Sequence, residues 1–449
     1  MYSPESKNHQ YSFTHDWFVV PKLDENHELV KISKTINWLT LSDKLAQFYC
    51  PDNGRPAKPS RAKVGLLILK HLYHLSDDDL VDLIKRDLYA QYLCDVSFSE
   101  AVKFIHPTTL VKFRKKIGLS GIKLIEEEVL NSLKRAKLLK NKILVCDTTV
   151  VPSNIAYPTD ISLLEKVRAK AVGYLEKARQ FGSGACRTYK RTARKIFITY
   201  QKIRHHTIQS RRRAQRKILQ FSKRNVAQLK NALEEISQKT DNSLNKVKER
   251  VQEQFLKQAQ AFLTTASNIV EQQKNIYKRL PVKERIVSAH QSHLRPMVRG
   301  KYPVEVEFGP KILLNLKNNF LFLEHISFSN VSDSQLLDIS LKGYQERFGY
   351  LPTQLAADRG FWSKDNRQLA QDYGIKKIAI ENKGKSSYLK GKPFRERLRR
   401  LRCKIEAKIS LSKRRYGLDR IRYTMPQGEE MWVRLGLIAM NLKTSAGYG

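Results

Sequence analysis

Three acidic residues are placed to build a metal site for phosphodiester chemistry. Asp147 and Asp358 each end a short apolar run that predicts a buried strand, and Glu406 lies in a very basic stretch with helical character, residues 395–415. Carboxylates on two strand ends and one helix can hold two divalent cations about 3.5–4 Å apart, which clamp a phosphodiester during in-line attack. The sequence therefore predicts a two-metal nucleotidyl-transfer site in which these three residues are both the metal ligands and the catalytic groups.

The charge balance indicates a polyanionic partner. The chain has 449 residues, a formal net charge of +40 and a pI of about 10.0. Such a charge is costly in self-repulsion unless a polyanion relieves it. Nucleic acid is the usual reason, and an anionic membrane is the weaker alternative. We therefore expect double-stranded DNA as the partner.

The apolar runs and the cysteines limit the class of protein and its localisation. A hydrophobic fraction of 41% is that of a folded globular protein. No apolar run approaches the roughly 20 residues of a membrane span, and the polar N-terminus lacks the apolar segment of a signal peptide. The five cysteines are scattered without a C-x-x-C pair, which argues against a disulfide framework and a zinc site. We expect no membrane association, and localisation to the cytoplasm with the nucleoid.

The N-terminal part, residues 1–140, reads as a helical domain. Apolar residues at helical spacing recur along it, and residues 107–116 predict a helix capped near Thr108 and basic at its end. Successive short helices with a basic last one are typical of a DNA-reading domain, and equally of a helical bundle with a solvated basic face. Both interpretations stay open at this point, with DNA binding as the expectation.

A basic helical stretch, residues 161–298, follows a first catalytic strand assigned to residues 141–160. No Gly or Pro occurs from Ala185 to Leu280, and the apolar spacing predicts one or two long amphipathic helices, or an antiparallel helical hairpin. Residues 177–233 hold 17 Lys and Arg and no acid. We expect this stretch to contact phosphates rather than to form only a solvated face, through a cluster that includes Arg211, Arg212 and Arg213.

Mixed structure returns in residues 299–449, where we expect one helix to end at Gly349 and another to be capped by Ser363, as Ser76 is expected to cap a helix of the N-terminal part. With the helical stretch set aside, the predicted order from residue 141 onward is strand, two strands, helix, strand, helix, strand, helix. That order is typical of a ribonuclease H-like core, in which the strands of Asp147 and Asp358 would be parallel neighbours with both carboxylates at one edge. The expected fold is an α/β ribonuclease H-like catalytic core with an N-terminal all-α domain and a large helical insertion after the first core strand.

The helix of Glu406 also carries cations on the same face. Arg399, Arg402 and Lys413 are spaced so that they share a helical face with Glu406. We expect them to bind DNA phosphates next to the acids.

Together these residues resemble the DDE transposases of bacterial insertion sequences. The similarity lies in the run around Asp147, in the run Asp358-Arg359-Gly360-Phe361-Trp362, and in a third block similar to the family signature Y-x2-R-x3-E-x6-K. Arg399 replaces the tyrosine of that signature, whereas Arg402, Glu406 and Lys413 match it. The large helical stretch follows the first strand, whereas better-known members insert before the final helix, so its role does not carry over.

The resemblance implies an enzyme that cleaves and joins DNA at terminal inverted repeats, by two-metal hydrolysis and strand transfer into target DNA. It implies two Mg²⁺ or Mn²⁺ ions as cofactors and a homo-oligomer on DNA. Two rival functions remain: a non-mobilising nuclease of the same fold, and a DNA-binding protein that no longer cuts. Intact carboxylates at all three positions disfavour the second rival.

Overall fold

A computed structural model describes residues 23–53, 56–97, 101, 104–238, 246–298, 306–380 and 393–448. The chain forms two compact units. One combines Met1–Asn154 with Gly309–Gly449, and the other is Ile155–Phe308. Within the described residues, no helix is long and apolar enough to cross a membrane.

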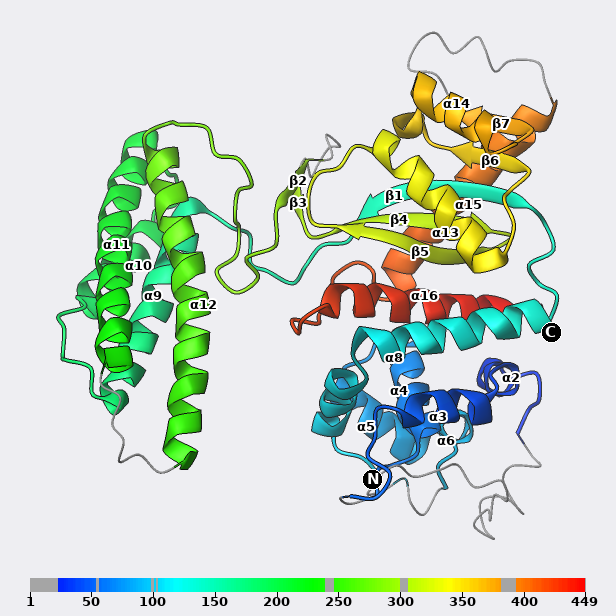
Figure 1. Cartoon of the computed structure of the whole chain (residues 1–449), viewed down its shortest axis with the longest axis horizontal. Helices are drawn as coiled ribbons and strands as arrows, with labels where there is room; N and C mark the ends of the chain where they lie inside the picture. The colour runs from blue at the N-terminus through cyan, green and yellow to red at the C-terminus, as the bar shows by residue number, and fades with distance from the viewer. Residues whose placement is uncertain are drawn as a thin grey trace. The chain divides into compact units, whose positions relative to one another are not determined.

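A five-stranded mixed sheet forms the centre of the first unit, in the order β5-β4-β1-β6-β7 (Figure 1). Its strands are β1 (Ile143–Val150), β4 (Lys311–Lys317), β5 (Phe320–Ser327), β6 (Gln354–Ala357) and β7 (Lys377–Ile380). The first three pair antiparallel, whereas β6 lies parallel to both β1 and β7. This mixed sheet is consistent with a ribonuclease H-like α/β core.

Helices cover both faces of the sheet. On one face α13 (Leu337–Phe348) packs against β4 and β5, and on the other α15 (Pro393–Arg415) crosses β1, β6 and β7. The alternation of side chains along β1 fits this division. Cys146 pairs with Asn315, which bonds Ser340 of α13, so the next residue, Asp147, faces α15. The short helices η3 (Asp333–Leu336), η4 (Arg359–Phe361) and α14 (Lys364–Asp372) connect the strands.

Among the described N-terminal residues, six helices share one hydrophobic core with this sheet. They are α2 (Glu28–Thr35), α3 (Trp38–Ala46), α4 (Ser60–Leu72), α5 (Asp77–Arg86), α6 (Leu88–Cys94) and α8 (Pro107–Arg135). The last helix of the chain, α16 (Gly428–Ala446), contacts α2, α4, α8 and β5, and so joins the two parts. A buried cation strengthens the join: Arg434 of α16 pairs with Glu126 of α8 and, at 2.8 Å, with Glu430.

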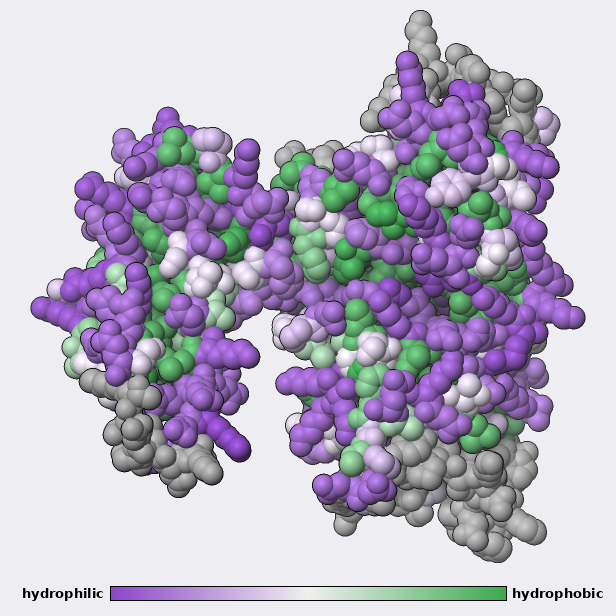
Figure 2. Space-filling view, in the orientation of Figure 1, coloured by the Kyte–Doolittle hydropathy of each residue, from purple (hydrophilic) through white to green (hydrophobic). Residues whose placement is uncertain are grey.

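The second unit is mostly helical. It contains α9 (Asp160–Ala178), η2 (Arg179–Phe181), α10 (Lys190–Gln201), α11 (Ile208–Gln238) and α12 (Lys246–Tyr277), followed by the antiparallel pair β2 (Pro296–Val298) and β3 (Val306–Phe308). Helices α9, α11 and α12 enclose a core of small and large apolar side chains, including Leu229 and Ile269. Figure 2 shows hydrophilic residues over most of its visible face, as expected for helices that bury one apolar stripe.

Several expected local features are confirmed. Ser76 and Ser363 cap α5 and α14, and α13 ends at Gly349 in a left-handed conformation. Others need correction. Asp147 does not end its strand, because β1 continues to Val150. The N-cap of α8 is His106, not Thr108, because Pro107 already occupies the first helical turn. The basic stretch forms more helices than the hairpin we expected, since α9 and α10 precede the pair α11 and α12.

Candidate active site

Two aspartates meet where strands β1 and β6 lie side by side. Cys146 of β1 is paired with Ala357, the last residue of β6, so Asp147 and Asp358 are the next residues on two parallel neighbours. Asp147 is partly buried within β1, whereas the Asp358 side chain, just beyond β6, is 44% exposed. The pairing brings both carboxylates to the same edge of the sheet, as the sequence predicted.

The third acid approaches from α15. Helix α15 contacts both β1 and β6, and the Glu406 side chain is 54% exposed on it. Arg402, one turn earlier, joins the acids: its Nη1 lies 3.3 Å from Asp358 Oδ1, and its Nε lies 3.7 Å from Glu406 Oε1. The guanidinium is largely shielded, with 20% of the side chain exposed. One cation therefore bridges the two outer carboxylates.

The electrostatics of Asp147 reflect this crowding. Burial above all, together with the charges of Asp358, Glu406 and Asp333, raises the pKa of Asp147 to about 7. The backbone N–H of Thr148 donates to Asp147 Oδ1 at 2.7 Å and opposes the rise. A cation bound beside this carboxyl group would offset burial and the like charges, and would lower its pKa.

Asp333 is a fourth acid that sequence reasoning missed. Its Oδ1 accepts a hydrogen bond from Thr148 Oγ1 at 2.7 Å and lies 2.6 Å from Lys311 Nζ. Asp333 is the first residue of η3. Its partner Thr148 follows Asp147 in β1, so the two side chains lie on opposite faces of the strand. The sequence carried no local pattern for this contact, because Thr148 and Asp333 are 185 residues apart.

The tight turn after Asp358 has a steric cause. A Cβ placed on Gly360 would lie 2.4 Å from Asp333 Oδ2, closer than real Cβ contacts come. The side chain of Asp333 therefore occupies the space beside η4 that any larger residue would need. Gly360 allows η4 to pass next to Asp333 and so helps to fix the position of Asp358, the residue before η4.

The remaining cations of α15 differ in their surroundings. Lys413 donates to the backbone carbonyl of Val150 at 2.7 Å, at the end of β1. Arg399 is exposed on the helix. Arg402 and Lys413 thus both lie beside the strand that carries Asp147.

The cluster Arg211, Arg212 and Arg213 is in the other unit, on α11. Arg211 and Arg213 are exposed. Arg212 is half-buried and lies over the ring of Tyr277, with its Cζ 5.1 Å from the ring centroid. This cluster therefore belongs to a different compact unit from the acids.

The acids fit a hard divalent cation by their chemistry. Carboxylate oxygens are the ligands that Mg²⁺ and Mn²⁺ prefer. The raised pKa of Asp147 and the guanidinium between Asp358 and Glu406 both indicate that positive charge stabilises the carboxylates at this position. Within the described residues, no three His, Cys, Asp or Glu side chains already converge as a ligand cluster. Asp147, Asp358 and Glu406 are the residues that could hold such ions, and Arg402 now lies between the last two.

Comparison with known proteins agrees with the sequence resemblance. The family described as "Transposase DDE domain" matches residues 310–442, which include Asp358 and Glu406, and "Transposase domain (DUF772)" matches residues 19–116 of the helical part. The chain is 30% identical over 186 residues to a protein of Rhizobium meliloti described as "Uncharacterized protein ORF8 in nfe locus", covering 41% of this chain and 88% of that protein. No solved structure matches.

Both matched families are transposase domains, and they lie in the order that the sequence resemblance requires. Members of the DDE family act on DNA and generally use divalent metal ions. The chain belongs to the DDE-type transposases of insertion sequences.

Proposed function

We propose that this transposase cleaves DNA at the terminal inverted repeats of its element and joins the freed ends to target DNA, using Asp147, Asp358 and Glu406. One observation carries the proposal: the carboxylates of Asp358 and Glu406 are close enough to share one guanidinium, and both act on the pKa of the buried Asp147. Burial and the repulsion between neighbouring carboxylates disfavour the charged form of Asp147, and a bound cation would offset both.

Two Mg²⁺ or Mn²⁺ ions, when bound, would supply Lewis-acid activation of the attacking and leaving oxygens. The chain's own residues do the rest. Asp147, in its deprotonated form, would hold the ions together with Asp358 and Glu406. Arg402, released from the two carboxylates, turns its planar guanidinium to a phosphate of the bound strand, which suits bidentate contact. Lys413 keeps a positive charge at the end of β1 and orders the carbonyl of Val150.

Binding is assigned to other parts of the chain. We propose that the N-terminal helices, residues 1–140, read the repeat, and that the acid-free stretch, residues 177–233, holds the backbone. In α8 the side chains of Lys112, Lys115 and Lys116 are exposed and available. Arg114 is not, because it is buried against Asp77 with an Nη2–Oδ2 distance of 2.5 Å. We also propose that the protein acts as a homo-oligomer, since two element ends must be handled together.

The test is cleavage of a duplex that carries the element's end. Asp147→Asn, Asp358→Asn and Glu406→Gln should each abolish cleavage in Mg²⁺ while binding stays largely intact, because phosphate contacts lie elsewhere. Asp338→Asn, an acid on α13 paired with Lys342 at 2.7 Å, is the matched control and should cut normally. Near-wild-type cleavage by any one of the three variants would remove that residue from the site. Failure of the wild type to cut would leave only DNA binding.

A further inference from the structure

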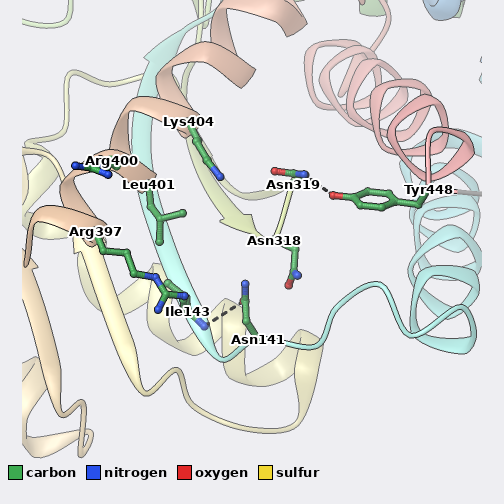
Figure 3. A pocket seen from close by; sticks show the side chains of 9 residues that line it. All are labelled: Asn141, Ile143, Asn318, Asn319, Arg397, Arg400, Leu401, Lys404 and Tyr448. Carbon is green, nitrogen blue, oxygen red and sulfur yellow. Dashed lines mark hydrogen bonds between the residues drawn. The ribbon is translucent and has the colours of Figure 1, made fainter. Parts of the chain in front are cut away.

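A second cationic site lies beside Ile143, where strand β1 begins, on the N-terminal side of Asp147. It is a cavity of about 400 Å³. Its lining comes from four separate parts of the first unit: the start of β1, the β4–β5 turn, α15 and the chain end after α16 (Figure 3). The lining residues are Asn141, Ile143, Asn318, Asn319, Arg397, Arg400, Leu401, Lys404 and Tyr448. Three of these are cations, four offer amide or hydroxyl groups, and none is an acid.

The cations of this pocket lie on a different side of α15 from the catalytic residues. Arg397 and Lys404 are seven residues apart, so at about 100° per residue they share one side of the helix. Glu406 follows Arg397 by nine residues and therefore lies about half a turn away around the axis. Helix α15 thus presents positive charge on two flanks, one beside the acids and one in this pocket.

The side chains in the pocket are oriented toward a shared space. In Figure 3, Arg397 and Lys404 extend toward Asn141 and Asn318, whereas Arg400 points away from them. Arg400 has a partner outside the pocket, since it donates to Glu396 at 2.9 Å. Both Arg397 and Lys404 are exposed. These two cations are therefore the ones available to a ligand in the cavity.

A buried lysine adds positive charge behind the pocket wall. Lys317 is fully buried and donates to the carbonyl of Asn141 and to the hydroxyl groups of Tyr344 and Tyr350. Burial lowers the pKa of Lys317 to about 8, so the group stays mostly charged at neutral pH. A water occupies about 30 Å³ of liquid, so the cavity has room for a hydrated phosphodiester. Arginine, lysine and amide groups around such a space are the groups that bind phosphate.

We propose that Arg397 and Lys404, with the amides of Asn141 and Asn318, hold a DNA backbone phosphate at a distance from the one being cut. This inference rests on the proposed function, because it takes DNA as the ligand. Asn141 precedes Asp147 by six residues, which is about 20 Å along a strand. One strand of B-form DNA advances about 3.4 Å per base pair. The phosphate in the pocket would therefore be about six base pairs from the scissile one.

The experiment measures duplex binding by fluorescence anisotropy across a salt series, with a duplex carrying the element's end. The double variant Arg397→Ala/Lys404→Ala should flatten the slope of log affinity against log salt by about 0.9, because one phosphate contact is lost. If the lines meet at 1 M salt, that slope change corresponds to roughly an 8-fold loss of affinity at 0.1 M. Arg397→Lys/Lys404→Arg keeps both charges and should retain most of the slope.

Two further measurements complete the experiment: a control for the loss of two positive charges, and a series of shortened duplexes that locates the phosphate contact. Lys342→Ala/Lys376→Ala removes two exposed lysines of the same unit outside the pocket and should leave the slope nearly unchanged. Duplexes shortened stepwise from each end should lose the difference between the wild type and the double variant about six base pairs from the cleavage position.

Equal slopes for the wild type and Arg397→Ala/Lys404→Ala would overturn the inference, whatever the cleavage result. If slopes are equal and inorganic phosphate stabilises only the wild type against unfolding, the pocket holds a free anion and not DNA. The proposed function is tested separately: a wild type that binds with the expected slope difference but never cuts would refute transposition and leave the pocket assignment intact.

Discussion

Replacing Asp147 with Asn should make the metal-free protein more stable at neutral pH. The ordinary pKa of an aspartate here is 3.8, and burial with three nearby acids raises it to about 7. The folded state therefore keeps a proton that the unfolded chain releases between about pH 4 and pH 7. The stability contributed by this group is present below pH 4 and is lost as pH rises through 7.

The magnitude follows from the pKa difference. At 1.36 kcal/mol per pKa unit, ionising Asp147 in the folded state at pH 7.5 costs about 4 kcal/mol. Asparagine has the same shape, carries no charge and can still accept from the N–H of Thr148. Because the side chain relaxes in part, we expect Asp147→Asn to gain about 2 to 4 kcal/mol in the free energy of unfolding at pH 7.5, and almost nothing at pH 4.

The assay is urea unfolding in EDTA, followed by tryptophan fluorescence. All four tryptophans lie outside residues 155–308, so the signal follows the first unit alone. Asp338→Asn is the control, because the ammonium of Lys342 lowers the pKa of Asp338 and its loss should not stabilise the protein at pH 7.5. Mg²⁺ should stabilise the wild type and not Asp147→Asn. No gain at pH 7.5, or an equal gain at both pH values, would show that Asp147 is not held among acids.

Three further predictions follow from the site and the basic stretch. Arg402→Ala should weaken both DNA binding and cleavage, and Arg402→Lys should restore only part of the activity, since the bidentate geometry is lost; full cleavage by Arg402→Ala would make it an ordinary surface cation. Gly360→Ala should cost about 1 to 3 kcal/mol in unfolding free energy and reduce cleavage, because its Cβ would meet Asp333; normal unfolding and cleavage would refute that contact. Neutralising Arg211, Arg212 and Arg213 of α11 together should flatten the slope of log affinity against log salt by about 2 to 3 units, while preference for the repeat over random duplex survives. An unchanged slope would mean that this surface does not touch phosphate.

The strands and their acids could be predicted from sequence because they depend on local patterns. Short apolar runs ending near Asp147 and Asp358 are typical of buried strands, and the parallel pairing of β1 with β6 follows from chain order. Helix ends were predicted where a capping side chain marks them, as at Ser76 and Ser363. The break between α10 and α11 was not, because residues 202–207 contain neither Gly nor Pro.

Contacts between distant segments were beyond sequence reasoning. Nothing local to Asp333 indicates its bond to Thr148, and nothing local to Lys413 indicates that it would donate to Val150. The pocket of Arg397 and Lys404 needs four segments to come together. The sequence predicted one cationic face of α15, beside Glu406. A second cationic face, with Arg397 and Lys404, has the same helical spacing, but it was not predicted because only the catalytic motif was considered.

The most direct measurement of the central claim is strand transfer by the purified protein. A duplex with the element's end already cut, leaving a free 3′-hydroxyl, is incubated with supercoiled plasmid and Mg²⁺, and joined products are resolved on a gel. We predict that the wild type joins the end to the plasmid, and that Asp147→Asn, Asp358→Asn and Glu406→Gln bind the end but join nothing. Cleavage of end DNA without any joined product would instead identify a nuclease, and joining by any of the three variants would contradict the assignment of these carboxylates.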